Sequence, residues 1–181
     1  MSEKLPSQIK DADFAFVNEP TKVIAVRNSA KIELAGLTVG PFEEGNEYDV
    51  RFWVARELEK AGIVRSREET LTASRLYKIQ WTERIQSVSN LSSLPEDFYP
   101  RLRRLIERLK RSSRSGPENM REYEYVQKLS KDIVGCRLKK IISLASTPGP
   151  KGQILRNLTV EELELYERLD KMIGSWRADI I

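Results

Sequence analysis

Catalytic side chains are scarce in this 181-residue chain, which has no histidine and a single cysteine, Cys136. Without imidazole, Ser-His-Asp and Cys-His nucleophilic sites and histidine-based zinc sites are excluded. Cys136 lies in the apolar run 133–136, which is typical of a small buried side chain rather than a nucleophile. The sequence therefore predicts a protein that is not an enzyme and that holds no cofactor or metal.

The acidic residues and glycines offer no convergent site either. Gly36, Gly40 and Gly45 have the spacing of turns and match no phosphate-binding loop. The paired carboxylates favour ordinary surface or helix-start charge over acid–base chemistry or metal binding; they are Asp11 with Asp13, Glu43–Glu44, Glu68–Glu69 and Glu161–Glu162.

A cluster of basic residues between 101 and 114 is the densest charged feature. Four arginines recur every three or four positions and so form one stripe on a helix: Arg101, Arg104, Arg108 and Arg111. Leu102, Leu105, Ile106 and Leu109 form another face, which we expect to be core. The stripe suits a solvated surface, a DNA phosphate backbone or a protein partner. No aromatic residue interleaves with it, which argues against stacking on single-stranded bases.

Several aromatic residues are candidates for a subunit interface. Tyr123 and Tyr125 are two positions apart, so they cannot share one face of a helix and one of them is expected to be exposed. Tyr166 and Trp176 belong to a series with three- and four-residue steps that also contains Leu163, Leu169 and Ile173. Such a stripe must be covered, either by other helices of this chain or by another subunit.

The periodicity predicts an α+β protein of two parts. Residues 1–12 are polar and predicted to be flexible, and 13–66 form a small β-rich module with strands near 22–27 and 48–50 and a helix over 52–61. Residues 70–181 form a helical bundle domain, with helices up to residue 89, over 100–112 and 118–146, and from Thr159 onward. Thr159 and Glu162 have the spacing of a capping box.

Charge and hydropathy limit the environment. The first 70 residues carry three more acidic than basic side chains, whereas the remainder carries seven more basic than acidic ones. A basic helical half favours contact with nucleic acid or an acidic partner. No apolar run reaches the length of a membrane span, and an unpaired cysteine fits a reducing cytoplasm.

Two groups of segments resemble the GINS family of replication proteins. Residues 40–45 (Gly-Pro-Phe-Glu-Glu-Gly), 52–58 (Phe-Trp-Val-Ala-Arg-Glu-Leu) and 62–64 (Gly-Ile-Val) resemble the small β domain of GINS subunits. Residues 94–99 (Leu-Pro-Glu-Asp-Phe-Tyr), the segment 129–144 and residues 158–166 resemble the family's helical domain. Together they span about 22–177, and their joint order is more specific than any one of them. Family members often have a proline where this chain has Arg51–Phe52.

The resemblance implies a role and partners. The β domain precedes the helical domain, as in one of the two archaeal subunit types. It implies a hetero-oligomer, expected to be a tetramer, that contains a sister GINS subunit and scaffolds the MCM helicase and a RecJ-like companion at the replication fork. We expect direct contact with DNA to be weak and non-specific. A DNA-binding regulatory protein that uses the basic helix 101–114 is the alternative.

Overall fold

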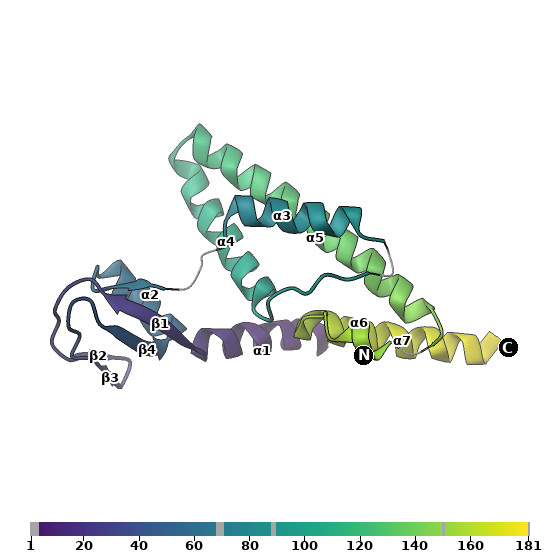
Figure 1. Cartoon of the computed structure of the whole chain (residues 1–181), viewed down its shortest axis with the longest axis horizontal. Helices are drawn as coiled ribbons and strands as arrows, with labels where there is room; N and C mark the ends of the chain where they lie inside the picture. Colours follow the sequence, from purple (N-terminus) through teal and green to yellow (C-terminus); the bar gives the residue numbers. More distant parts are fainter. Residues whose placement is uncertain (1–3, 68–70, 88–89, 150, 181) are drawn as a thin grey trace. The chain divides into compact units, whose positions relative to one another are not determined.

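The computed structural model describes residues 4–67, 71–87, 90–149 and 151–180, and the chain divides into two compact units, 1–70 and 71–181 (Figure 1). Glu68 and Glu69, one of the carboxylate pairs, lie outside the described residues. The first unit contains the strands and the second is helical, so the α+β architecture predicted from the sequence is confirmed.

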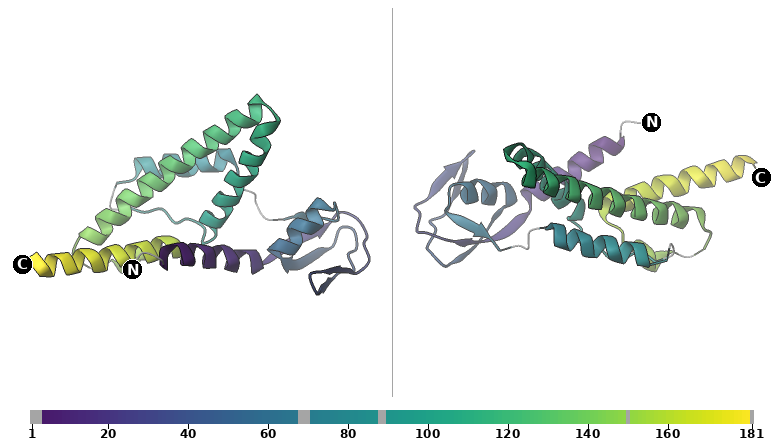
Figure 2. Two further views of the ribbon diagram at one scale, coloured as in Figure 1. Left: turned by 180° about the vertical axis from the view of Figure 1, so that it is seen from behind. Right: turned by 90° about the horizontal axis from the view of Figure 1, so that it is seen from above.

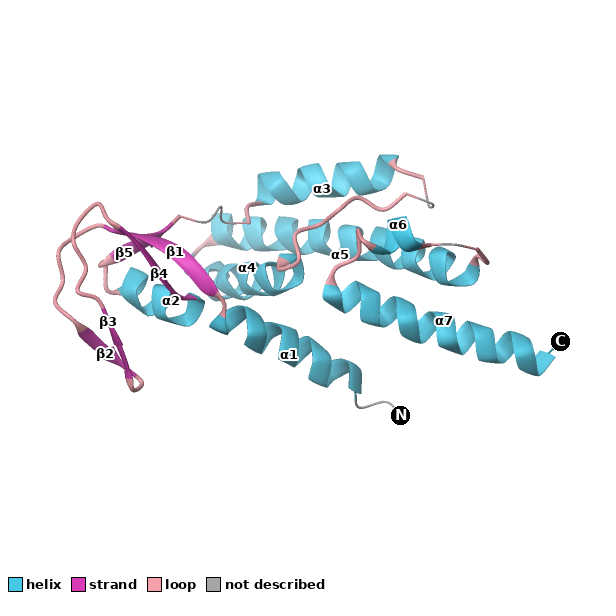
Figure 3. Ribbon diagram, turned by 60° about the horizontal axis from the view of Figure 1, so that its bottom comes forward, coloured by secondary structure: helices cyan, strands magenta, loops and turns pink. Residues whose placement is uncertain are grey.

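The first unit is a three-stranded antiparallel sheet in the order β4-β1-β5, covered by helix α2 (Phe52–Lys60). The strands are β1 (Pro20–Ala25), β4 (Glu47–Arg51) and β5 (Val64–Ser66), with Val23 opposite Tyr48 and Ser66. Alternate residues of β1 are buried, as expected for a strand with one face on the core. A separate hairpin pairs β2 (Ile32–Leu34) with β3 (Leu37–Val39) (Figure 3).

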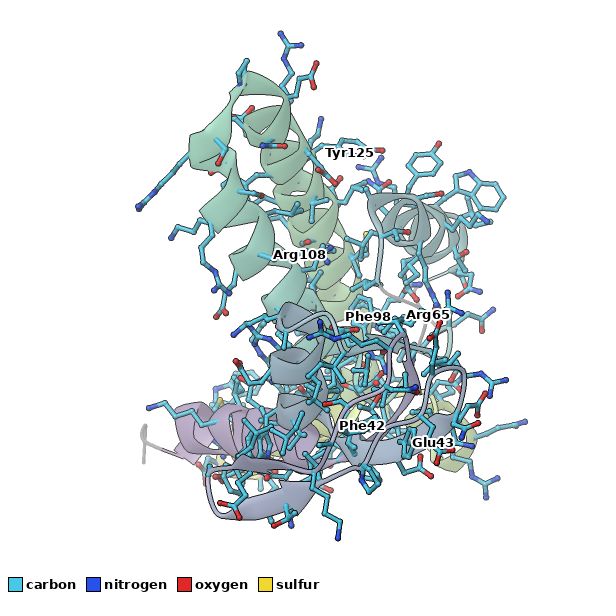
Figure 4. All side chains as sticks on the ribbon, turned by 90° about the vertical axis from the view of Figure 1, so that its left-hand side faces the viewer. Phe42, Glu43, Arg65, Phe98, Arg108 and Tyr125 are labelled. Carbon is cyan, nitrogen blue, oxygen red and sulfur yellow. The ribbon has the colours of Figure 1, made fainter. Side chains whose placement is uncertain are left out.

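The core of this unit contains Val23, Phe42, Val54 and Leu58, all almost completely buried; Phe42 is labelled in Figure 4. Phe42 packs edge-on against Tyr48, with ring centroids 4.9 Å apart. Helix α2 follows β4 without a linker, because Arg51 keeps an extended backbone and Phe52 begins the helix. Arg51 therefore ends a strand directly before a helix.

The amino-terminal segment, whose residues 1–12 were predicted to be flexible, contributes to a helix from Lys4 onward. Helix α1 (Lys4–Asn18) includes most of that segment and also Phe14, in a region where weak alternation had suggested the start of the β-rich module. Phe16 is buried and its ring lies 4.7 Å from the ring of Phe52. The polar composition of the segment concealed this helix, in which the buried ring of Phe16 packs against the module.

The second unit is built around the 30-residue helix α5 (Pro117–Ser146). Helix α4 (Phe98–Ser112) and the short 3-10 turn Ser113–Ser115 precede it, and α3 (Ala73–Ile85) lies beside it (Figures 1 and 2). Leu102 and Leu105 of α4 pack with Val126, Leu129 and Ile133 of α5 in one core cluster. Helix α3 begins at Ala73, later than the periodicity suggested, because Thr72 caps it by accepting a hydrogen bond from the Arg75 amide at 3.3 Å.

The carboxyl-terminal half of α5 packs against a different helix. After the short helix α6 (Gly152–Leu155), helix α7 (Val160–Ile180) lies along α5, and Tyr166 is buried against Ile141 and Ala145. The Arg177 guanidinium donates to the Ser146 carbonyl at 2.7 Å, so α5 ends opposite the last turns of α7. Figure 3 shows the carboxyl-terminal end of α7 extending past the end of α5.

Candidate interaction surfaces of the helical bundle

A buried ionic network centred on Arg137 lies where the helices of the bundle meet. Its guanidinium donates to both carboxylate oxygens of Glu162, at 2.8 and 2.5 Å, and to Glu83 Oε1 at 3.1 Å. It also donates to the carbonyls of Ser92 at 2.7 Å and Asn157 at 3.1 Å. An arginine has five N–H donors, so every donor of this fully buried side chain is used.

Glu83 is the second centre of the network, and Lys140 and the Ser92 hydroxyl also donate to it, Lys140 at 2.7 Å. Burial alone would raise the pKa of Glu83. The hydrogen bonds from Lys140 and Ser92 and the charges of Arg137 and Lys140 outweigh burial, so the pKa of Glu83 lies below its ordinary value. Two cations and two carboxylates, all buried, therefore neutralise one another.

Glu162 has two functions. The Thr159 amide donates to its carboxylate at 3.1 Å, and the Glu162 amide donates to the Thr159 hydroxyl at 3.4 Å, so the predicted capping box is confirmed. The same carboxylate holds Arg137 and accepts the Tyr99 hydroxyl at 2.7 Å. Burial, followed by the charge of Glu162, raises the pKa of Tyr99 well above its ordinary value. The network thus joins α3, α4, α5 and α7 through side chains.

The four arginines predicted to form a stripe are all on α4, but they differ in availability. Arg101 is half-buried and pairs with Asp97, and the neighbouring Arg103 pairs with Glu161 at 3.4 Å. Arg104 is half-buried and engaged, whereas Arg108 and Arg111 are exposed; Arg108 is labelled in Figure 4. The basic stripe therefore presents its charge to solvent mainly at its carboxyl-terminal half.

The four aromatic candidates for an interface separate into two kinds. Tyr166 is buried within the bundle and its hydroxyl lies 3.4 Å from Asp170, so its ring faces its own chain. Tyr123 is half-buried and accepts a hydrogen bond from Gln127 at 3.1 Å. Tyr125 is 47% exposed and Trp176 is 63% exposed. Of the two tyrosines separated by two positions, one is thus exposed, as the helical spacing predicted.

Two exposed apolar lines, which we call the α5 line and the α7 line, run along the carboxyl-terminal half of the bundle. The α5 line consists of Val134, Leu138 and Ile142, each about 40% exposed and four residues apart. The α7 line consists of Met172, Trp176 and Ile180, which have the same spacing and are about two-thirds exposed. Leu165, Leu169 and Ile173 pack onto the bundle, and the apolar sequence of α7 continues through Trp176 and Ile180 to the end of the helix.

Among the described residues, no group of three or more histidine, cysteine or acidic side chains is placed to hold a metal ion. Over the same residues, no helix combines the length and apolar character needed to cross a membrane.

The comparison with protein families gives the decisive observation. The family model of the GINS complex protein helical bundle domain, Sld5, matches residues 70–181, which is more than half of the chain. The chain belongs to the GINS family. A search of curated proteins found no match. GINS proteins are subunits of a DNA-replication complex that contains other GINS subunits, so this chain is a subunit of that kind.

The three helical segments that resemble GINS proteins meet at the ionic network. Tyr99 comes from segment 94–99, Arg137 and Lys140 from 129–144, and Thr159 and Glu162 from 158–166. The resemblance to GINS proteins therefore includes residues that hold the fold together. Sequence reasoning missed the network because Arg137 and Glu162 are 25 positions apart, and Glu162 was assigned to ordinary surface or helix-start charge. The available signal was a pair of cations three residues apart, Arg137 and Lys140, on an otherwise mostly apolar face of a helix.

Proposed function

We propose that this chain is a non-enzymatic scaffold subunit of a GINS complex and that it joins a sister GINS subunit through the α5 and α7 lines. The observation that supports this most directly is the uncovered apolar surface of α7. Trp176 and Ile180 continue the apolar sequence of the helix, yet about two-thirds of each side chain is exposed. Monomeric proteins rarely expose contiguous apolar surface without a partner to cover it.

The composition of this surface supports a protein partner. Valine, leucine, isoleucine and methionine form it together with one tryptophan, and buried interface centres are rich in aromatic residues and methionine and poor in charge. The ionic network lies inside the bundle near the amino-terminal end of α7 and fixes α7 against α5. A rigid pair of helices lowers the ordering cost of association.

The finer assignment follows the resemblance to GINS proteins. We infer a hetero-tetramer in the cytoplasm of an archaeon, with this chain as the subunit type whose small β domain precedes the helical domain. The tetramer would scaffold the MCM helicase and a RecJ-like companion at the replication fork. The small first unit, with its own core around Phe42 and Leu58, suits a module that docks on a neighbouring protein.

The test is co-expression with the sister GINS subunit of the same organism. Leu138→Glu places a charge in the α5 line, where the side chain is 40% exposed, so folding is retained while association is lost. Ile85→Glu is the matched control, because Ile85 is also exposed but lies on α3. Equal loss of the complex in both variants, or in neither, would contradict the proposed interface.

A further inference from the structure

A second exposed surface, which differs chemically from the apolar lines, lies where α3 runs beside α5. Tyr77 and Trp81 are four residues apart on α3, so they share one face, and they are 52% and 56% exposed. Gln80 donates to Asp132 at 2.8 Å and Arg84 reaches the same carboxylate at 3.4 Å. These two contacts fix which side of α5 adjoins this face of α3.

Positive charge surrounds these rings. Lys78 and Arg84 are exposed on α3. Lys128 and Lys139 are exposed on α5, four residues before and seven residues after Asp132, so both lie on the side of α5 that adjoins α3. Two further residues lie on the same side of α5 by helical spacing. Arg121 is eleven residues before Asp132, and Tyr125, which is 47% exposed, is seven residues before it. Figure 4 labels Tyr125.

Few acidic groups oppose this charge. Asp132 is half-buried and accepts from Gln80 and Arg84, and the other acidic side chains that the helical spacing places on this side of α5 are Glu118 and Glu122, in the first two turns of the helix. On α3, Glu83 is buried in the network and neutralised there. The surface around Tyr77 and Trp81 is therefore cationic.

We propose that this aromatic and cationic surface of α3 and α5, the α3 face, binds single-stranded nucleic acid. Exposed rings that alternate with lysines and arginines are the features by which proteins hold single strands, because the rings stack on bases and the cations follow the phosphates. Tyr77 and Trp81 are about 6 Å apart along the helix axis at 1.5 Å per residue. That spacing exceeds the roughly 3.4 Å base repeat, so each ring can take its own base.

The lysine content of the α3 face favours nucleic acid over a protein partner. Lysine is depleted at the centres of protein interfaces, whereas the α3 face has Lys78, Lys128 and Lys139 around its rings. The α5 and α7 lines have the opposite composition, with aliphatic side chains at their centre. Two kinds of partner thus suit two different surfaces of one bundle, and the nucleic-acid site does not depend on the proposed subunit interface.

The test is fluorescence anisotropy of a labelled 20-residue oligothymidylate, with the chain in complex with its sister subunit and at low salt. Trp81→Ala should weaken binding about tenfold, which corresponds to about 1.4 kcal/mol and lies within the usual range for loss of one stacked base. Trp81→Phe keeps a ring and should restore most of the affinity. Circular dichroism melts should match, because Trp81 is exposed.

Charge removal at two sites identifies which helix faces the strand. The double substitution Lys78→Gln with Lys128→Gln should reduce the slope of the logarithm of the binding constant against the logarithm of salt concentration by about 1.4. Each lost phosphate contact accounts for roughly 0.7 of this slope on a single strand. Arg108→Gln with Arg111→Gln removes the same charge from α4 and should have the smaller effect. A 20-base-pair duplex should bind more weakly than the single strand and be insensitive to Trp81→Ala, while oligouridylate of equal length shows whether DNA or RNA is preferred.

Three results would overturn the proposal. The first is the absence of binding at low salt, or binding that Trp81→Ala leaves unchanged. The second is a larger loss from the α4 pair, which would place the nucleic acid on the basic helix 101–114. The third is dissociation of the hetero-oligomer by Trp81→Ala, which would make the α3 face a protein interface.

Discussion

Arg137→Lys should destabilise the helical unit strongly even though it conserves the charge. Arg137 makes five hydrogen bonds, to the carboxylates of Glu83 and Glu162 and the carbonyls of Ser92 and Asn157. Lysine has three donors on a single nitrogen, so at least two of these bonds are lost. A hydrogen bond to a charged group contributes about 1.5–3 kcal/mol, and the loss is therefore about 3 kcal/mol or more.

Arg137→Ala removes the cation as well and should cost more, at the upper end of the roughly 3–5 kcal/mol typical when one partner of a buried ion pair is removed. The stability of a whole domain is only about 5–15 kcal/mol, so the alanine variant is expected to be marginal. Arg137→Ala should therefore be less stable than Arg137→Lys, and Arg137→Lys should be less stable than the wild type. Arg108→Lys on the exposed part of α4 is the matched control and should stay within about 0.5 kcal/mol.

The assay is urea denaturation of the full chain, followed by helical circular dichroism. With an m-value of about 2 kcal/mol/M, a loss of 3 kcal/mol moves the midpoint by about 1.5 M. Equal midpoints for Arg137→Lys and Arg108→Lys would contradict this expectation, because the five contacts of Arg137 would then contribute no more to stability than a surface arginine does.

Three further outcomes follow from the same structure. Thr159→Ala should lower stability by about 1 kcal/mol in a thermal melt, as loss of a capping hydroxyl does, and an unchanged melting temperature would contradict the capping box. The pKa of Glu83 is lower in the folded chain than its unfolded value of 4.5, so the ionised carboxylate stabilises the fold above pH 4.5 and this stabilisation is lost as the pH falls below that value. Urea midpoints should therefore decline below pH 4.5, and they should decline less steeply in Glu83→Gln. Trp176→Ala should leave the melt of the isolated chain within about 0.5 kcal/mol but weaken the hetero-oligomer, and destabilisation of the isolated chain would show that its own bundle covers the ring.

Much of the fold was predictable from local patterns. The helix from Thr159 was predicted because its cap is a contact between residues three positions apart, and the strand near 22–27 because its alternation is visible. Helix α1 was missed, because its helical segment is polar and its attachment depends on a ring contact between Phe16 and Phe52. The sequence therefore predicts helices and strands better than it predicts the contacts, between residues far apart in the chain, that pack these helices and strands together.

The exposed surfaces of the bundle were likewise predictable from the sequence only where they depend on local spacing. The arginine stripe was visible from its spacing, but the ion pair of Arg101 with Asp97 and the partial burial of Arg104 reduce its exposed charge. Trp176 belongs to a stripe that the sequence predicted to be covered by this chain or by another subunit, and only the structure shows that its ring is 63% exposed on this chain. The α3 face combines residues of α3 and α5, and the periodicity of each helix by itself does not show that the two helices lie side by side.

The most direct test of the central claim is the mass in solution of the complex between this chain and its sister GINS subunit, by light scattering after size exclusion. For the wild type we expect a single hetero-oligomer of defined mass, consistent with four subunits. For Leu138→Glu we expect separate components and an unchanged melt of the isolated chain. A Leu138→Glu chain that still forms the wild-type complex, or a wild-type chain that does not associate with its sister subunit, would contradict it.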